Sequence, residues 1–239
     1  MKEIKILHLF PHLLSLYGEY GNLAMLKAEL EQAGHTVTVT CYEAGEPDLQ
    51  QDLIYIGSGT EDNLLVALQR LAPYADMIKE SVEAGTPWLA TGNAMTLFGK
   101  TVTRREQTVP ALGVFEYITE IDDSQRYLGD ALSDDRFAGA PSLGFINTCN
   151  RYLGIETPLL QLRLGAKLGN DKISAADGIR EQNFFGTQLI GPFLTKNPHI
   201  LSFFVNLLTG ADHTCPPDSM IQKAYAVSAS ELAKRLNGK

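Results

Sequence analysis

The chain is poor in cysteine and in positive charge. It contains three cysteines, Cys41, Cys149 and Cys215, which are too few and too scattered for a disulfide framework or a zinc knuckle. Acidic residues outnumber basic ones, and the formal net charge is −8. Because non-specific binding to nucleic acid or to an anionic membrane requires basic patches, we expect neither as a partner.

Long apolar runs are missing as well. No stretch approaches the roughly 18 apolar residues of a membrane-spanning helix. His8, Pro11 and His12 interrupt the beginning of the chain, which is atypical of a signal peptide. We therefore expect a cytoplasmic protein without a membrane span. A hydrophobic fraction of 44% and a charged fraction of 20% are ordinary for a globular protein.

Strand and helix patterns alternate along the first hundred residues. Apolar runs predict strands, and spacings of three and four predict helices, in the order strand 4–9, helix 23–34, strand 37–41, strand 53–56 and helix 64–82. Asn22 is a candidate cap for the first helix, and Cys41 a core residue of the second strand. The alternation predicts an α/β fold with a doubly wound, mostly parallel sheet flanked by helices.

Residues 87–100 contain the turn around which the chain is organised. An apolar strand at 88–90 breaks at Thr91, Gly92 and Asn93 and continues as a helical segment through Phe98. This order places the turn at the carboxyl edge of a parallel sheet, where open α/β sheets bind ligands. In hydrolases built this way the turn carries an exposed nucleophile. This turn contains neither Cys nor Ser.

A second turn, at residues 57–62, follows the strand at 53–56. Gly57, Ser58 and Gly59 lead into a helix that begins near Glu61, and backbone N–H groups at such a helix start suit an anion or an oxyanion. Short turns between strand and helix also need glycine for steric reasons alone. The turn by itself is therefore weak evidence for a binding site.

The second half of the chain is less regular. We expect a strand at 114–119, hairpins and loops at 122–135, a polar loop at 144–154 and a strand region at 168–177. Asn197 and Pro198 predict the start of a helix that ends at Gly210. Ser228 and Glu231 form a capping box for a last helix. We expect a single domain over residues 1–239, with a core at about 4–210 and a C-terminal helical extension at 211–239.

The order and spacing of several motifs resemble one family. These motifs lie at residues 16–22, 57–61, 111–114, 126–130, 144–154 and, most specifically, 186–198. The chain resembles the class I glutamine amidotransferase-like family of the cobyric acid synthase type. Within it the resemblance is greatest to the glutaminase subunits (GatD) of lipid II isoglutaminyl synthase. The resemblance implies a flavodoxin-like fold with extra hairpin strands in the middle of the chain.

The resemblance also implies where catalytic residues would lie. The family nucleophile lies in Cys-Gly-Gly-Tyr-Gln-x-Leu-Gly, which puts Gly92 at the Cys position and Thr96 at the Gln position. The family base is the His of Gly-Thr-x-Leu-His-Gly-Pro, a position held here by Ile190. A glutaminase needs a thiolate and an imidazole, and loss of either lowers turnover on the order of 10⁶-fold in a comparable hydrolase. The resemblance thus predicts a member without glutaminase activity.

Several candidates for binding or altered chemistry remain. Cys149, Thr91 or Thr96 could act as a relocated nucleophile. Arg151 could hold a carboxylate bidentately or form a surface ion pair. The acids Glu19, Glu61 and Asp62 could bind an amino group. The candidate ligand-binding positions are Gly57, Gly59, Glu61, Gly92, Asn93, Thr96, Asn147, Cys149, Arg151 and Ile190.

Partners follow from the resemblance. It implies a Mur-ligase-like partner of the MurT type, which in the family amidates the D-glutamate of the lipid II stem peptide with ammonia from glutamine. A small amino-acid or amide ligand without a partner protein is the alternative, and no cofactor is implied. His8, His12, His199 and His213 have no carboxylate or cysteine at ligand spacing, so we expect surface or capping roles and no metal site.

Overall fold

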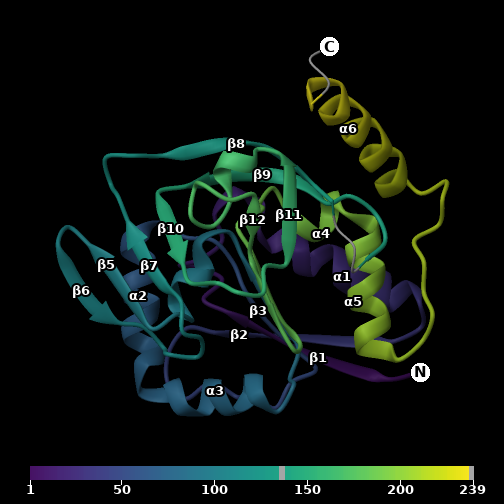
Figure 1. Cartoon of the computed structure of the whole chain (residues 1–239). Helices are drawn as coiled ribbons and strands as arrows, with labels where there is room; N and C mark the ends of the chain where they lie inside the picture. The colour runs from purple at the N-terminus through teal and green to yellow at the C-terminus, as the bar shows by residue number, and fades with distance from the viewer. Residues whose placement is uncertain (135–137, 237–239) are drawn as a thin grey trace.

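A computed structural model describes residues 1–134 and 138–236. Asp135 of the expected hairpin region and residues 237–239 of the expected extension therefore lie outside the described residues. The chain builds a central six-stranded sheet (Figure 1). In spatial order its strands are β13 (Ile179–Glu181), β14 (Phe184–Thr187), β4 (Trp88–Thr91), β3 (Leu53–Ile56), β1 (Glu3–Leu9) and β2 (Thr36–Tyr42).

Five of these strands are parallel. Strands β2, β1, β3, β4 and β14 run in the same direction, and β13 pairs antiparallel with β14 at one edge. Strand β2, with its alternating Thr and Val residues, lies at the other edge, as its half-polar pattern predicts. The predicted α/β fold with a mostly parallel sheet is confirmed.

Helices cover both faces of this sheet because the strands are apolar on both sides. Ile54 and Ile56 of β3 belong to one core cluster with residues of α2 and α3. Leu53 and Tyr55 belong to the opposite cluster with residues of α1 and α5, in keeping with the period of two in a strand. The helices are α1 (Tyr20–Gln32), α2 (Glu61–Leu71), α3 (Ala75–Glu83) and α5 (Pro198–Thr209).

The middle of the chain forms two smaller sheets between β4 and β13 in sequence. One has the order β10-β7-β5-β6 and the other β12-β11-β8-β9, so the expected extra hairpin strands are present. Their strands are β5 (Thr101–Arg104), β6 (Gln107–Pro110), β7 (Ile118–Ile121), β8 (Tyr127–Ser133), β9 (Leu143–Thr148), β10 (Asn150–Leu153), β11 (Leu160–Leu164) and β12 (Ala176–Asp177).

Short helical segments and a terminal helix complete the structure. The short segments are η1 (Leu16–Gly18), η2 (Ala72–Tyr74), η3 (Gly92–Leu97), η4 (Ala166–Leu168) and α4 (Phe193–Lys196). The terminal helix α6 (Met220–Leu236) follows a long connection after α5 and extends from the body of the molecule (Figure 1). Its buried residue Leu232 packs with Leu132 and Leu143 of the β8–β9 pair.

Some predicted element boundaries are wrong. The helix predicted at 64–82 is interrupted at residues 72–74, because Pro73 lacks the N–H group that a continuous helix needs. The polar loop predicted at 144–154 is the strand pair β9 and β10. The strand predicted at 114–119 begins only at Ile118. The strand region predicted at 168–177 is mostly turns, with strand only at β12.

Three expectations for single residues are also corrected. Asn22 does not cap α1, which begins at Tyr20, because its side-chain oxygen instead accepts a hydrogen bond from the N–H of Leu194 at 2.7 Å. Cys41 is exposed at the end of the edge strand, where Tyr42 is buried instead. Ser228 lies inside α6, which begins at Met220, so it starts no helix.

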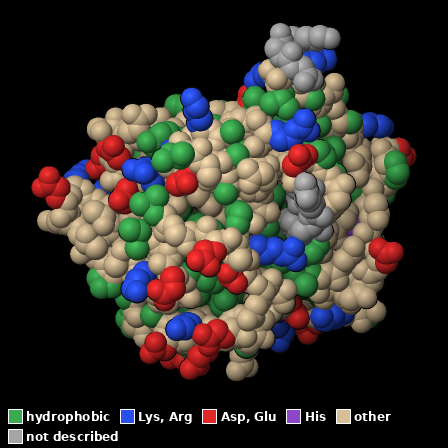
Figure 2. Space-filling model, viewed as in Figure 1, with side chains coloured by type: hydrophobic (Ala, Val, Ile, Leu, Met, Phe, Trp, Pro, Cys, Tyr) green, Lys and Arg blue, Asp and Glu red, His purple; other side chains and the backbone are tan. Residues whose placement is uncertain are grey.

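The surface carries both signs of charge. Figure 2 shows acidic and basic side chains interspersed on one face of the molecule, with apolar side chains between them. The acidic residues therefore do not form a single continuous negative patch on this face. Among the described residues, no helix combines the length and the apolarity needed to cross a membrane.

Candidate functional site

The turn after β4 holds Gly92 in a conformation that favours glycine. Its φ is 63°, in the left-handed region, which costs other residues roughly 1–2 kcal/mol. A β-carbon at this position would lie 2.7 Å from Cβ of Ser58 and closer still to its hydroxyl oxygen. Ser58 therefore occupies the space into which a side chain at position 92 would project.

Ile190 closes the same space from the other side. Its Cγ2 atom lies 3.0 Å from the position of a β-carbon on Gly92, and its side chain is buried. The backbone of Ile190 is fixed by two hydrogen bonds with Phe145 of β9, at 2.9 and 3.2 Å. The two positions that the sequence pairs as nucleophile and base are thus neighbours in space. Their catalytic assignment remains a prediction.

Asn93 uses the hydrogen-bonding groups of the glycine-rich turn. Its side-chain oxygen accepts hydrogen bonds from the Gly59 N–H at 3.0 Å and from the Ser58 hydroxyl at 3.1 Å. Its side-chain nitrogen donates to the Gly59 carbonyl at 2.8 Å. The N–H of Gly59 is therefore already paired and is not free for an oxyanion.

Close packing explains the glycines of this turn. A β-carbon on Gly57 would lie 2.7 Å from the Leu14 carbonyl oxygen, and one on Gly59 would overlap the Leu14 side chain. These contacts are the steric reason for glycine that the sequence left open. The turn packs beneath residues 13–16, with the Leu16 N–H donating to the Ser58 carbonyl at 2.9 Å.

A buried carboxylate, Glu19, joins the segments around Gly92. Its Oε2 atom accepts hydrogen bonds from Thr91 and from the Tyr55 hydroxyl, and its Oε1 atom accepts one from the Gly191 N–H at 3.3 Å. Burial raises the pKa of Glu19 to about 7, although these hydrogen bonds favour the charged form. The sequence placed Glu19 in a loop where it could bind an amino group, but the side chain is fully buried.

A cavity of about 230 Å³ opens beside the turn. Arg126, the first residue of the sequence motif at 126–130, pairs here with Glu61 at 3.3 Å and donates to Asn147 at 3.1 Å. A guanidinium and a carboxylate on one wall suit a small zwitterionic ligand. The lining residues are Leu16, Tyr17, Gly59, Thr60, Glu61, Asn93, Arg126 and Asn147, four of which the sequence proposed.

Cys149 lies between β9 and β10 as a buried thiol. Its sulfur donates a hydrogen bond to Oε1 of Glu61 at 3.0 Å. Burial and the contact with Glu61 raise the pKa of Cys149 to about 12. Because the thiolate is the reactive form, this environment disfavours Cys149 as a relocated nucleophile.

The two threonine candidates are buried as well. Thr96 accepts a hydrogen bond from Asn150 at 2.7 Å and lies 3.3 Å from the Tyr152 hydroxyl, and neither neighbour is a base. Thr91 does contact a potential base, because its hydroxyl donates to Glu19. However, Thr91 is fully buried and does not line the cavity beside the turn.

Arg151 and Asp62 form ion pairs outside this cavity. Nη1 of Arg151 lies 3.3 Å from Oε2 of Glu120 on the neighbouring strand β7, which is the surface ion pair that the sequence left open. Asp62 pairs with Arg104 at 2.5 Å. The structure does not bring either side chain to the candidate ligand cavity.

The expected surface role of the histidines holds only in part. His12 is exposed and lies 2.7 Å from Glu43. His8 is buried against Tyr55, with a ring-centroid distance of 5.1 Å, and burial lowers its pKa to about 4. Burial likewise lowers the pKa of His199 to about 4. His8 is therefore a neutral part of the packed interior, and His199 is a half-buried neutral side chain against Tyr225.

Comparison with known proteins agrees with the motifs. The sequence profile of the CobB/CobQ-like glutamine amidotransferase domain matches residues 5–198. The chain is 27% identical over 210 residues to "Lipid II isoglutaminyl synthase (glutamine-hydrolyzing) subunit GatD" of Staphylococcus aureus (strain N315), covering 86% of this chain and 84% of that one. It is 25% identical over 203 residues to the subunit of the same name from Streptococcus pneumoniae (strain ATCC BAA-255 / R6), covering 83% and 77%.

A solved structure supports the fold. A crystal structure of a glutamine amidotransferase superposes with a TM-score of 0.52 at 16% identity, covering 86% of this chain and 99% of the other. Identity this low speaks to the fold alone. The family resemblance inferred from the motifs is confirmed, and the interpretation of positions 92 and 190 stays a prediction.

Proposed function

The chain belongs to the CobB/CobQ-like glutamine amidotransferase family, and from this premise we propose that it is a member that does not hydrolyse glutamine and serves as a non-catalytic subunit. A hydrolytic member would need a nucleophile at the turn after β4 and a base facing it. In this chain those two positions hold a hydrogen atom and a branched hydrocarbon.

The proposal is carried by the contact between Gly92 and Ile190. Ile190 and Ser58 fill the space into which a side chain on Gly92 would project, so no room remains there for a thiol. The oxyanion donor that Gly59 could offer is bonded to Asn93. Both reactive groups are thus absent and one possible oxyanion donor is occupied, which favours a lasting loss of hydrolysis.

We propose a Mur-ligase-like protein as the partner. Both similar relatives are named as subunits of lipid II isoglutaminyl synthase. A subunit that has lost its own catalytic activity could still bind the other subunit of such a complex. In this role the chain would stabilise a ligase that amidates a cell-wall precursor. Affinity isolation from the native cell tests this proposal: recovery of a Mur-ligase-like protein supports it, and recovery of the chain alone contradicts it.

We further propose that the cavity beside Asn93 retains a small amino acid or amide. The carboxylate of Glu61 and the guanidinium of Arg126 line it together, and each matches one end of a zwitterion. Such a ligand would be sensed and not consumed.

A glutamine-hydrolysis assay on the purified chain, alone and with its isolated partner, tests the loss of activity. We expect no glutamate release above the rate without protein. Hydrolysis that disappears in a Cys149→Ala variant would overturn the proposal, because it would identify a relocated thiol nucleophile.

An altered hydrolase is the second candidate, and the hydrogen bond from Thr91 to Glu19 favours it. In that case Glu19 would act as the base and Thr91 as the nucleophile. The test is an assay of amide and ester hydrolysis. If this candidate is right, the wild type and the matched variant Thr96→Val hydrolyse the substrate and Thr91→Val does not. Equal activity in the two variants excludes this candidate.

A further inference from the structure

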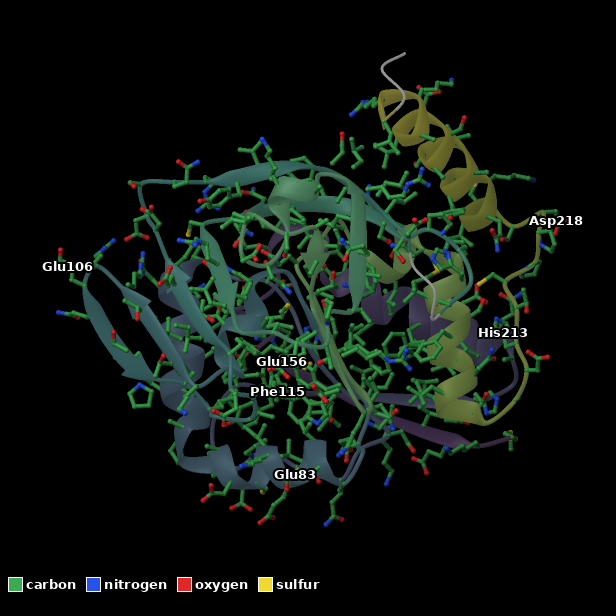
Figure 3. All side chains as sticks on the ribbon, viewed as in Figure 1. Glu83, Glu106, Phe115, Glu156, His213 and Asp218 are labelled. Carbon is green, nitrogen blue, oxygen red and sulfur yellow. The ribbon has the colours of Figure 1, made fainter. Side chains whose placement is uncertain are left out.

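Three side chains of types that bind metals meet outside the cavity beside the turn after β4. Glu29 lies on α1, and His213 and Cys215 lie on the connection between α5 and α6; Figure 3 labels His213 there. One ligand atom from each of the three lies within 4.8 Å of the others, and Nε2 of His213 is 3.2 Å from Oε2 of Glu29. We propose that these three residues bind a zinc ion.

The ligand set suits zinc. Zinc in proteins takes thiolate, imidazole and carboxylate ligands, and sites with three protein ligands leave a fourth position for water or another group. A thiolate in the set also favours zinc over magnesium or calcium, which prefer oxygen. Cys215 is fully buried and Glu29 nearly so, whereas His213 is partly exposed, so the group is neither a surface acid cluster nor an isolated thiol.

Hydrogen bonds from α5 hold the two ligands of the connection in place. The side chain of Asn206 accepts from the His213 N–H at 2.6 Å and donates to its carbonyl at 3.1 Å. One helical turn earlier, the Ser202 hydroxyl accepts from the Cys215 N–H at 3.0 Å. These contacts fix the backbone at both ligands, which is the support that a metal site requires.

The present contacts of the Cys215 sulfur are weak. It accepts a hydrogen bond from the Ser202 hydroxyl at 3.4 Å and donates one to the Pro198 carbonyl at 3.5 Å, and sulfur is a poor donor and a poor acceptor. An ion pair between His213 and Glu29 accounts for two of the three side chains, and the thiol would then be a small packed core residue. A zinc ion explains all three.

The site is separate from the family's catalytic region. Two of its ligands, His213 and Cys215, lie beyond residues 5–198, which match the family domain, and no ligand lines the cavity beside Asn93. A bound ion would fasten the connection to α1 and α5 and so set where α6 begins. The expectation of no metal site was based on the spacing around each histidine; it passed over Cys215, two residues after His213, and could not include Glu29, which lies 184 positions away.

Metal titration of the untagged, metal-free chain tests the proposal. We expect one Zn²⁺ per chain, a rise in melting temperature with Zn²⁺, and, with Co²⁺ as a probe, the absorption of a tetrahedral site with a thiolate-to-cobalt band. Cys215→Ser should lose that band, and Cys215→Ser, His213→Gln and Glu29→Gln should each weaken Zn²⁺ binding about tenfold or more. The matched variants Cys41→Ser, His12→Gln and Glu31→Gln should bind as the wild type does.

Protease protection gives a second readout that does not depend on the buried cysteine variant. Zn²⁺ should slow cleavage within residues 210–219 of the wild type, and the His213→Gln variant, in which a partly exposed side chain is changed, should lose this protection. Absence of Zn²⁺ binding by the wild type, or equal binding in the ligand and matched variants, would overturn the proposal.

Discussion

The side-chain amide of Asn93 pairs with both backbone groups of Gly59. It accepts from the N–H at 3.0 Å and donates to the carbonyl at 2.8 Å. A single side chain thus satisfies both backbone groups of Gly59, two residues before α2 begins. The arrangement ties the turn after β3 to the turn after β4, the two turns that border the candidate site.

Replacing Asn93 by Ala should destabilise the protein on the order of 2 kcal/mol, because the N–H and carbonyl of Gly59 would be left buried and unpaired. Urea unfolding measures the change. Asn183→Ala, which removes a single bond to the Gly85 carbonyl in a less buried place, is the matched variant and should cost less. Equal losses in the two variants would contradict the role given to Asn93.

Restoring catalytic residues at two positions should fail. In the double variant Gly92→Cys with Ile190→His, the free energy of unfolding should be about 1–3 kcal/mol lower than in the wild type, since the side chain at position 92 would collide with Ser58. Adding Ser58→Gly should return part of this stability and permit measurable glutamate release. The experiment compares unfolding and glutaminase assays of the double and triple variants. Activity in the double variant equal to that in the triple would show that Ser58 is no obstacle.

Glu19 should make stability fall as the pH rises. Its folded pKa of about 7 lies above the ordinary 4.5, so between these values the folded state holds a proton that the unfolded state has released. The free energy of unfolding therefore decreases from about pH 4.5 to 7, by roughly 3 kcal/mol in total from this group.

Glu19→Gln, which mimics the protonated acid, should remove this decrease. His8, whose folded pKa is lowered to about 4, acts in the opposite direction, so the difference between wild type and variant isolates the effect of Glu19. Urea unfolding at pH 5, 6 and 7 provides the measurement, and the exposed Glu31→Gln is the matched variant. Parallel pH profiles for wild type and Glu19→Gln would refute the assignment.

Thiol labelling should distinguish the cysteines. Cys41 is exposed and should react with iodoacetamide first, whereas Cys149, with its pKa raised to about 12, should stay unmodified until the protein unfolds. Mass spectrometry of labelled peptides, with Cys41→Ser as the control, follows each thiol. If Cys149 were labelled at the same rate as Cys41, its thiol would be accessible and reactive, and Cys149 would again be a candidate nucleophile.

The choice between Arg126 and Arg151 can be made by ligand binding. If the cavity beside Asn93 holds a zwitterion, Arg126→Gln should weaken L-glutamine binding about tenfold or more. Arg151→Gln should leave it unchanged, since Arg151 does not line this cavity. Calorimetric titration with L-glutamine and D-glutamate measures both. A larger effect of Arg151→Gln would indicate that the ligand binds near the β10–β7 pair instead.

The fold was predictable because its signals are local. The apolar runs that became β3 and β4 and the glycines that end α1 and α3 are read within a few residues. The family motifs added the extra sheets in the middle of the chain, although not their strand boundaries. Pro73, which interrupts the helix predicted at 64–82, was a local signal that could have been used.

The details of the site were not predictable because they depend on tertiary contacts. The hydrogen bonds between Asn93 and Gly59 and the burial of Glu19 by Tyr55 and Thr91 join residues distant in sequence. The selection of Arg126 over Arg151 depends on tertiary position, because Arg126 in the connection before β8 reaches Glu61 of α2, whereas Arg151 of β10 pairs with Glu120 of β7. No periodic pattern in the sequence indicates which of the two arginines lines the cavity.

The pairing of Trp88 in β4 with Phe184 in β14 has a consequence for folding. The segment containing β5 to β13 lies between these two strands in the chain. Closing this long loop costs conformational entropy, which must be lost before Gly92 and Ile190 can meet. Gly92 and Ile190 should therefore come together in a late step of folding. A chain released from synthesis before β14 would present the open edge of β4 to solvent and to other chains.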